Sequence, residues 1–196
     1  MARGRTHGTR VAWFLLVGLL TSGCSSLPYS SDYPLSSYHL SSPGGTFRFR
    51  IPRGWFSAGN GRDTAADSHG TRNLIWLLKN DYSATIAVAE IHVDSTARRL
   101  LRDEGLAPFA NLTAGLTSGG NSSVLVRPPE FFRLNGREFC SYETLISSTG
   151  DAMRIVLFTD GSKLFEATAL VKQGGNGADR AEVFSAQQSF LDSLRW

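Results

Sequence analysis

The stretch FFRLNGREFCSYETLISSTGDAMRIVLFTDGSKLFEATALV, residues 131–171, determines the predicted fold. Its apolar runs are separated by Asn135-Gly136 and Asp160-Gly161, dipeptides that strongly favour two-residue hairpin turns. A third polar turn, Thr149-Gly150-Asp151, lies between them. Because hairpins join neighbouring antiparallel strands, the stretch predicts a four-stranded meander over residues 131–134, 137–147, 153–159 and 163–171.

Apolar residues occupy both faces of the third strand, over residues 153–158. A strand buried on both faces needs a layer above and a layer below its sheet. One layer is a helix that Asp179 caps and that runs to Trp196, with an apolar stripe in which Gln187 is the polar member. A helix near residues 95–116 is expected to cover the other face.

Three earlier segments are predicted strands, at residues 46–51, 74–78 and 83–93. A further short strand at residues 123–126 is expected to stop before Pro128-Pro129. Together these elements predict an α+β fold, with a central, mainly antiparallel sheet of about six to seven strands sandwiched between helices.

Residues 1–23 have the layout of a secretory signal peptide, with a basic start, a short apolar block and small residues at the end. The segment Leu20-Thr21-Ser22-Gly23-Cys24 resembles the bacterial lipobox, whose cysteine becomes the acylated N-terminus of the mature protein. The resemblance implies lipidation of Cys24 and membrane attachment through that lipid. In lipoproteins of bacteria with two membranes, a serine after the acylated cysteine is typical of sorting to the outer membrane. Ser25 follows Cys24, so this similarity implies that the protein is anchored in the outer membrane and faces the periplasm. Simple signal-peptidase cleavage near Gly23 is the alternative.

Residues 24–44 are expected to be a lipidated cysteine followed by a tether. Eight of the residues from Ser25 to Ser42 are serine, and they show no helical or strand period, which is typical of a flexible linker. Residues 45–196 are then predicted to form a single α+β domain. Its length suffices to bury a sizeable core.

The charge of the chain depends on the leader. The whole chain has 20 basic and 17 acidic residues. Arg3, Arg5 and Arg10 lie in the leader, which has no acidic residue, so the mature protein is expected to be neutral. A protein without a net positive field has little attraction for phosphate backbones, and nucleic-acid binding is therefore not expected.

The segment from Phe47 to Trp55 (FRFRIPRGW) resembles the start of PsbP-like domains. The hairpin around Asp160-Gly161 and the C-terminal helix fit the same plan, so the resemblance covers about residues 45–196. It implies a central antiparallel sheet between helices. Members of this Mog/PsbP superfamily mostly bind or stabilise other proteins and share no active site, so the resemblance implies a binding role.

Cys140 and one polar loop are the candidates for chemistry. Cys140 would need a nearby base and an electropositive setting to act as a nucleophile, and free cysteine is more often a core residue. Asp63, Asp67 and His69 share a polar loop and have side chains that can bind a divalent cation, but at no known ligand spacing. No catalytic residue, metal or cofactor is assigned on these patterns.

Two further positions are candidates for contact with other molecules. Trp55 follows the first predicted strand and is either a core residue or an aromatic anchor for a partner. Glu90 and His92 share one face at a strand end, where they are either solvated or part of a groove. The surface around Trp55, Asp63, Asp67 and His69 is the predicted partner contact.

Three functional hypotheses remain. The first is a membrane-anchored, non-catalytic module that binds or assembles a protein of the cell envelope. The second is a carrier that holds an apolar small molecule or lipid in a cavity between sheet and helix. The third, a hydrolase or metalloenzyme, requires polar side chains with shifted pKa values to converge in one cleft.

Overall fold

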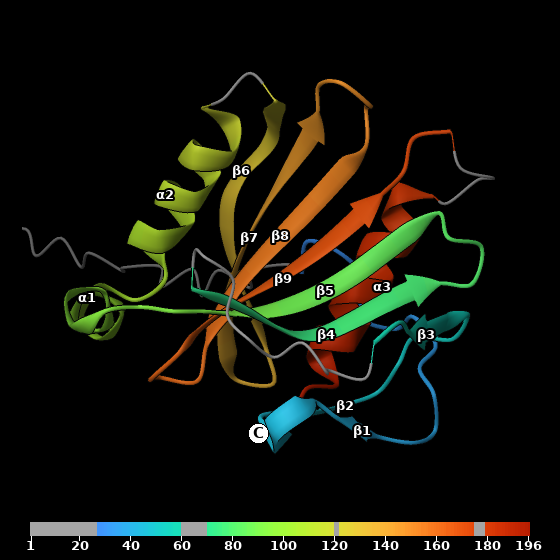
Figure 1. Cartoon of the computed structure of the whole chain (residues 1–196), viewed down its shortest axis with the longest axis horizontal. Coiled ribbons are helices and arrows are strands. Elements are labelled where there is room, and N and C mark those ends of the chain that lie inside the picture. The colour runs from blue at the N-terminus through green and yellow to red at the C-terminus, as the bar shows by residue number, and fades with distance from the viewer. Residues whose placement is uncertain (1–26, 60–69, 120–121, 175–178) are drawn as a thin grey trace, which may run out of the picture.

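Seven antiparallel strands form the main sheet of the computed structural model, in the order β3-β4-β5-β9-β8-β7-β6 (Figure 1). The structure describes residues 27–59, 70–119, 122–174 and 179–196. The strands are β3 (Trp55–Ser57), β4 (Thr71–Lys79), β5 (Ala84–Ile91), β6 (Ser123–Leu134), β7 (Arg137–Ile146), β8 (Ala152–Thr159) and β9 (Leu164–Val171). A second sheet pairs β1 (Leu40–Ser41) with β2 (Arg48–Phe49), and the short 3-10 helix η1 (Pro43–Gly45) connects them. The predicted α+β fold and the four-stranded meander β6–β9 are confirmed.

Three α-helices cover the sheet: α1 (Ser95–Glu104), α2 (Ala107–Ser118) and α3 (Arg180–Asp192). The side chain of Asp94 accepts a hydrogen bond from the Ala97 N–H at 2.7 Å, and Asp179 accepts one from Ala181 at 3.0 Å. Both caps satisfy backbone donors that a helix start leaves free. None of the helices in the described part of the chain is long and apolar enough to cross a membrane.

The two faces of the sheet belong to two apolar clusters. The larger cluster packs α3 against residues such as Val156, Phe158 and Phe165. The smaller one packs α1 and α2 against their alternating neighbours, such as Ile155 and Leu157. The sheet is thus sandwiched between helices, as the two-sided apolar pattern of β8 predicted.

Two details of the strands differ from the prediction. β6 continues through Pro128-Pro129 to Leu134, because it is an edge strand whose free side needs no donors and whose register shifts beside the prolines. β8 and β9 are joined by residues 160–163 rather than by a two-residue turn. The side chain of Asp160 accepts hydrogen bonds from the Ser162 and Lys163 N–H groups, both at 2.8 Å, which favours the longer loop.

The C-terminal helix ends earlier than expected, at Asp192. The backbone of Arg195 pairs with Arg48, with N···O distances of 2.7 and 2.8 Å, so the last residues extend alongside β2. The first predicted strand is correspondingly shorter: only Arg48–Phe49 is a strand, and it belongs to the small sheet. Phe47, Phe49 and Ile51 are nevertheless buried, as their alternation predicted.

Residues 27–44, expected to be a flexible tether, pack against the domain instead. Tyr29 makes an edge-to-face contact with Phe184 of α3, at 5.3 Å between ring centroids. The backbone N–H of Tyr33 donates to Ser189 Oγ at 2.9 Å, and Leu35 forms a bridge with Pro52. The expectation of a tether is therefore wrong over this range, because the packing of the partly buried Tyr29 and Tyr33 outweighs the flexibility that the serines favour. The ordered body begins by residue 27 rather than 45.

Candidate functional site

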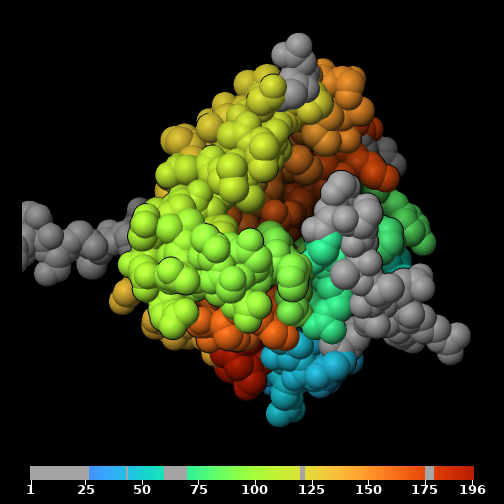
Figure 2. All heavy atoms as spheres, turned by 60° about the vertical axis from the view of Figure 1, so that its left-hand side comes forward, coloured from blue at the N-terminus to red at the C-terminus, as the bar shows by residue number. Residues whose placement is uncertain are grey.

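One half of the sheet is not covered by the helices on its side. α1 and α2 pack over β7 and β8, where Phe109 and Ala110 meet Tyr142 and Ile155. In the described part of the chain, α1 and α2 reach β5 and β9 only at one end, at Ile91 and Leu164, and no helix lies over the rest of this face of β9, β5 and β4 (Figure 1). In the space-filling view, a hollow beside α2 has a floor in the colours of the last strands (Figure 2).

The side chains on this uncovered half follow from the strand period. Because alternate residues of β5 and β9 fill the main core, the residues between them point to the other face. On β5 these residues are small, and neighbouring strands align them in rows, with Trp76 beside Ala87 and Ala87 beside Thr168. We define the open sheet face as Trp76, Thr85, Ala87, Ala89, Glu166 and Thr168.

Trp76 is the large apolar group of the open sheet face. It is 54% exposed, although its neighbours in sequence, Ile75 and Leu77, are buried. An exposed indole on a strand beside small alanine and threonine residues provides apolar area with one hydrogen-bond donor. Indole faces also attract cations.

Glu166 lies where the open half of the sheet meets the helix-covered half. Its cross-strand neighbours are Ala89 on the open side and Leu157, which is fully buried, on the covered side. Thr168 Oγ1 donates a hydrogen bond to Glu166 Oε1 at 2.9 Å. No described residue forms an ion pair with Glu166, and burial raises the pKa of this carboxyl. The arrangement can accept a cationic group, because an approaching positive charge would stabilise a carboxylate that has a neutral hydroxyl, and no basic group of the described residues, as its partner.

A buried polar cluster lies on the opposite face, beneath α3. Arg154 of β8 is fully buried. Its Nη1 donates to Gln187 Oε1 at 3.1 Å and its Nη2 to Gln188 Oε1 at 2.7 Å. Burial lowers the pKa of Arg154 to about 10, and the guanidinium remains charged at neutral pH. The sequence prediction missed this residue, although it shares a face with Val156 and although Gln187 was recognised as polar within the α3 stripe.

Glu143 completes this cluster and ties the N-terminal segment to it. Its buried carboxylate is paired with Arg180, lies 3.2 Å from Arg127 Nη1, and accepts a hydrogen bond from the Tyr29 hydroxyl at 2.7 Å. Burial, together with that bond to Glu143, raises the pKa of Tyr29 to about 12. The Arg154 guanidinium lies 4.9 Å from the centre of the Tyr29 ring. Together these contacts hold the N-terminal segment on the domain, which is a structural role.

The structure locates some of the predicted contact residues. Trp55 is 7% exposed and belongs to the main core, which favours the interpretation of a core residue over that of an anchor for a partner. Asp63, Asp67 and His69 lie outside the described residues, as does Cys24. The predicted contact surface around Trp55 is therefore not assembled by the residues that the structure describes.

Cys140 is buried on β7, on the face that α1 and α2 cover. Burial raises the pKa of its thiol to about 12, helped by the charges of Glu138 and Glu130. A thiol with so high a pKa is almost entirely protonated at neutral pH and is a poor nucleophile. Cys140 therefore acts as a small core residue.

Glu90 and His92 do line a common depression, of about 170 Å³, together with Gly70 and Arg72. Burial alone would raise the pKa of Glu90, but hydrogen bonds and charge from Arg72 and Lys163 outweigh it and lower the pKa. Because Glu90 is thus satisfied by two basic partners, it has little capacity left for a further cation.

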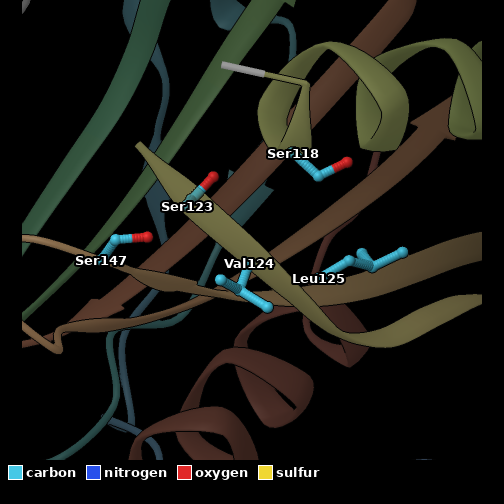
Figure 3. A pocket seen from close by; sticks show the side chains of 5 residues that line it. All are labelled: Ser118, Ser123, Val124, Leu125 and Ser147. Atoms are coloured by element: carbon cyan, nitrogen blue, oxygen red, sulfur yellow. The ribbon is translucent and has the colours of Figure 1, made fainter. Parts of the chain in front are cut away.

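Two larger depressions lie elsewhere on the surface. One, of about 340 Å³, is lined by Ser118, Ser123 and Ser147 with Val124 and Leu125 (Figure 3). The other, of about 310 Å³, lies where β1 and β2 approach β4. Both are at the small end of the range for ligand pockets, and none of the described residues that line them is charged.

No protein-family model and no curated protein sequence matches the chain. Among solved structures it is similar to cyanobacterial PsbP (CyanoP) from Synechocystis sp. PCC 6803, at 14% identity and a TM-score of 0.48, over 83% of this chain and 92% of that one. It is also similar to a protein from Bacteroides thetaiotaomicron, at 14% identity and a TM-score of 0.38 over 80% of this chain. This chain covers 47% of that protein's length. Both are similarities of fold.

Proposed function

We propose that the protein is a lipoprotein of the bacterial cell envelope that binds another protein and does not catalyse a reaction. In this proposal Cys24 carries the lipid, the outer membrane holds the anchor, and the domain faces the periplasm. The partner is an envelope protein, and it docks on the open sheet face.

The observation that carries the docking proposal is the position of Glu166. Its carboxylate lies at the edge of a sheet face that the described helices leave open, is partly withdrawn from water, and has no basic partner among the described residues. A lysine or arginine of a partner would supply the missing charge. Trp76 lies on β4, on the other side of β5 from Glu166 and one row of paired residues away. Its indole would cover apolar side chains of the partner beside that cation. The partner segment is thus expected to combine a basic residue with apolar neighbours.

Site-specific photo-crosslinking in intact cells tests the docking surface. A photoreactive amino acid at Ala87, in the centre of the open sheet face, should give a discrete crosslinked protein. The same amino acid at Leu112, exposed on the outer side of α2, is the matched control. Glu166→Gln and Trp76→Ala should each weaken the product formed from position 87. Equal products from both positions, or no response to either substitution, would refute docking on this face.

The anchor is tested separately. Mass analysis of the purified protein should show a mature chain that begins at an acylated Cys24. Cys24→Ala should move the protein from the membrane fraction to the soluble fraction. An unmodified N-terminus, or unchanged partitioning of the Cys24→Ala variant, would remove the lipoprotein assignment without affecting the docking surface.

A further inference from the structure

The short distance between Cys24 and the ordered domain restricts how the domain can sit on a membrane. Three residue steps separate Cys24 from Leu27, where the described structure begins, and they span at most about 11 Å when fully extended. Tyr29, two residues later, is fixed on the domain by Glu143 and Phe184. A lipid on Cys24 would therefore hold the surface around Leu27 next to the bilayer.

This surface lies on the α3 side of the sheet, at its β6 edge. The N-terminal segment packs against α3 and runs behind the sheet in the view of Figure 1. Val124 and Arg127 of β6 point to this side, because their partners on β7 are Leu145, which packs on the main core, and Glu143.

The surface combines exposed apolar groups with arginines. Val124 is 57% exposed and Val126 is 42% exposed, and Leu27 is also exposed. The side chains of Arg127 and Arg180 flank Tyr29 and Glu143 and are about two-fifths exposed. We define the anchor-side surface as Leu27, Val124, Val126, Arg127 and Arg180.

The charge of the surrounding cluster suits a lipid headgroup layer. Three guanidinium groups, those of Arg127, Arg154 and Arg180, are matched by the two carboxylates of Glu130 and Glu143, which leaves a net positive charge. Exposed aliphatic side chains beside basic ones favour the boundary between anionic headgroups and acyl chains. A single positive charge contributes little to the attraction between this surface and the membrane, so most of that attraction comes from the apolar contact and the lipid anchor.

We infer that the anchor-side surface lies against the headgroup region of the bilayer that holds Cys24. This inference rests on the proposed function, which supplies the lipid. The domain would thus be held in one orientation, instead of moving freely on a tether.

Quenching of tryptophan fluorescence by brominated lipid tests the orientation. The full-length lipidated protein is reconstituted into vesicles of phosphatidylethanolamine and phosphatidylglycerol that contain dibrominated phospholipid. Val124→Trp is compared with Leu116→Trp, a matched control that replaces a residue 72% exposed on the outer side of α2. The parent protein supplies the background from its own tryptophans, and Val126→Trp is a second reporter should Val124→Trp fold poorly.

The added emission at position 124 is expected to fall in brominated vesicles, whereas that at position 116 should not change. Equal quenching at both positions, in a protein whose acylated Cys24 is verified by mass, would overturn the orientation and leave the lipoprotein assignment intact. An unmodified Cys24 would overturn both. A dimer that Val124→Lys dissociates, together with an unquenched reporter at position 124, would show that a second copy covers this surface and would also overturn the inference.

Discussion

Replacing Arg154 with methionine should destabilise the protein strongly, although Arg154 lies on the side of the sheet opposite to the open sheet face. The guanidinium is fully buried and donates to the side-chain oxygens of Gln187 and Gln188. Methionine is flexible and fills much of the volume, so Arg154→Met separates the loss of hydrogen bonds from the loss of packing. Glu143 keeps Arg127 and Arg180 as partners, so the substitution does not leave the Glu143 carboxylate without a cation.

The magnitude follows from the two hydrogen bonds to the glutamine oxygens, because the third bond of the guanidinium, from Nη1 to the Phe184 carbonyl oxygen, is long at 3.5 Å. Bonds to a charged group contribute about 1.5–3 kcal/mol each, and both glutamine oxygens lose their donor. Relief of the cost of burying a guanidinium offsets part of this loss. We therefore expect Arg154→Met to lower the free energy of unfolding by about 2–4 kcal/mol. In a double-mutant cycle, Gln188→Met should cost clearly less in the Arg154→Met background than alone, because the bond is then already lost.

Urea titration of the purified variants, followed by tryptophan fluorescence and circular dichroism, measures these values. Arg133→Met, at an exposed position of the edge strand β6, is the control and should change the free energy of unfolding by no more than about 0.5 kcal/mol. A loss at Arg154→Met as small as that of the control would refute the claim that this cluster holds α3 on the sheet. Strict additivity in the cycle would refute the assigned hydrogen bond.

Three further outcomes are expected. Burial raises the pKa of Glu166 above 4.5, the ordinary value of a glutamate, so this group lowers stability as the pH rises above that value. In urea titrations Glu166→Gln should be the more stable protein at neutral pH, and its advantage should vanish in acid. Tyr29→Ala removes the contacts with Phe184 and Glu143, so limited proteolysis should cut residues 27–45 faster than in Tyr38→Ala, which replaces an exposed tyrosine; equal rates would contradict the packing of that segment. Cys140 should resist iodoacetamide in the native state and react in urea, and rapid native alkylation would show that the thiol is accessible.

The meander could be predicted from the sequence because its signals are local. Asn135-Gly136 adopts the positive φ angles, 49° and 78°, that the tight turn between β6 and β7 requires. The two-sided apolar pattern of β8 likewise required helices on both faces. The course of β6 through Pro128-Pro129 could not be read in this way, because a proline is tolerated only once a strand is known to lie at an edge.

The cluster beneath α3 depends on contacts between segments far apart in the chain. Tyr29, Glu143 and Arg154 come from the N-terminal segment and two strands, and each alone is typical of a surface. The one available signal was the coincidence of Arg154 on an apolar strand face with Gln187 in an apolar helix stripe. The open sheet face could not be predicted from the sequence either, because Glu166 and Trp76 lie on the same surface only when β9 pairs with β5.

The anchor-side surface and the open sheet face lie on opposite sides of one sheet. The short connection from Cys24 to Leu27 therefore determines which of the two faces the membrane. Val124 and Arg127 are on the α3 side, whereas Trp76 and Glu166 are on the side of α1 and α2. An anchor within about 11 Å of Leu27 that holds the first side at the bilayer would turn the second toward the periplasm, where a partner can reach it. A flexible tether of twenty residues would leave both sides accessible in every orientation. Packing of residues 27–44 on the domain would thus allow the lipid to set the orientation of the domain. The face turned toward the periplasm would be the one that carries Glu166, which forms no ion pair with any described residue.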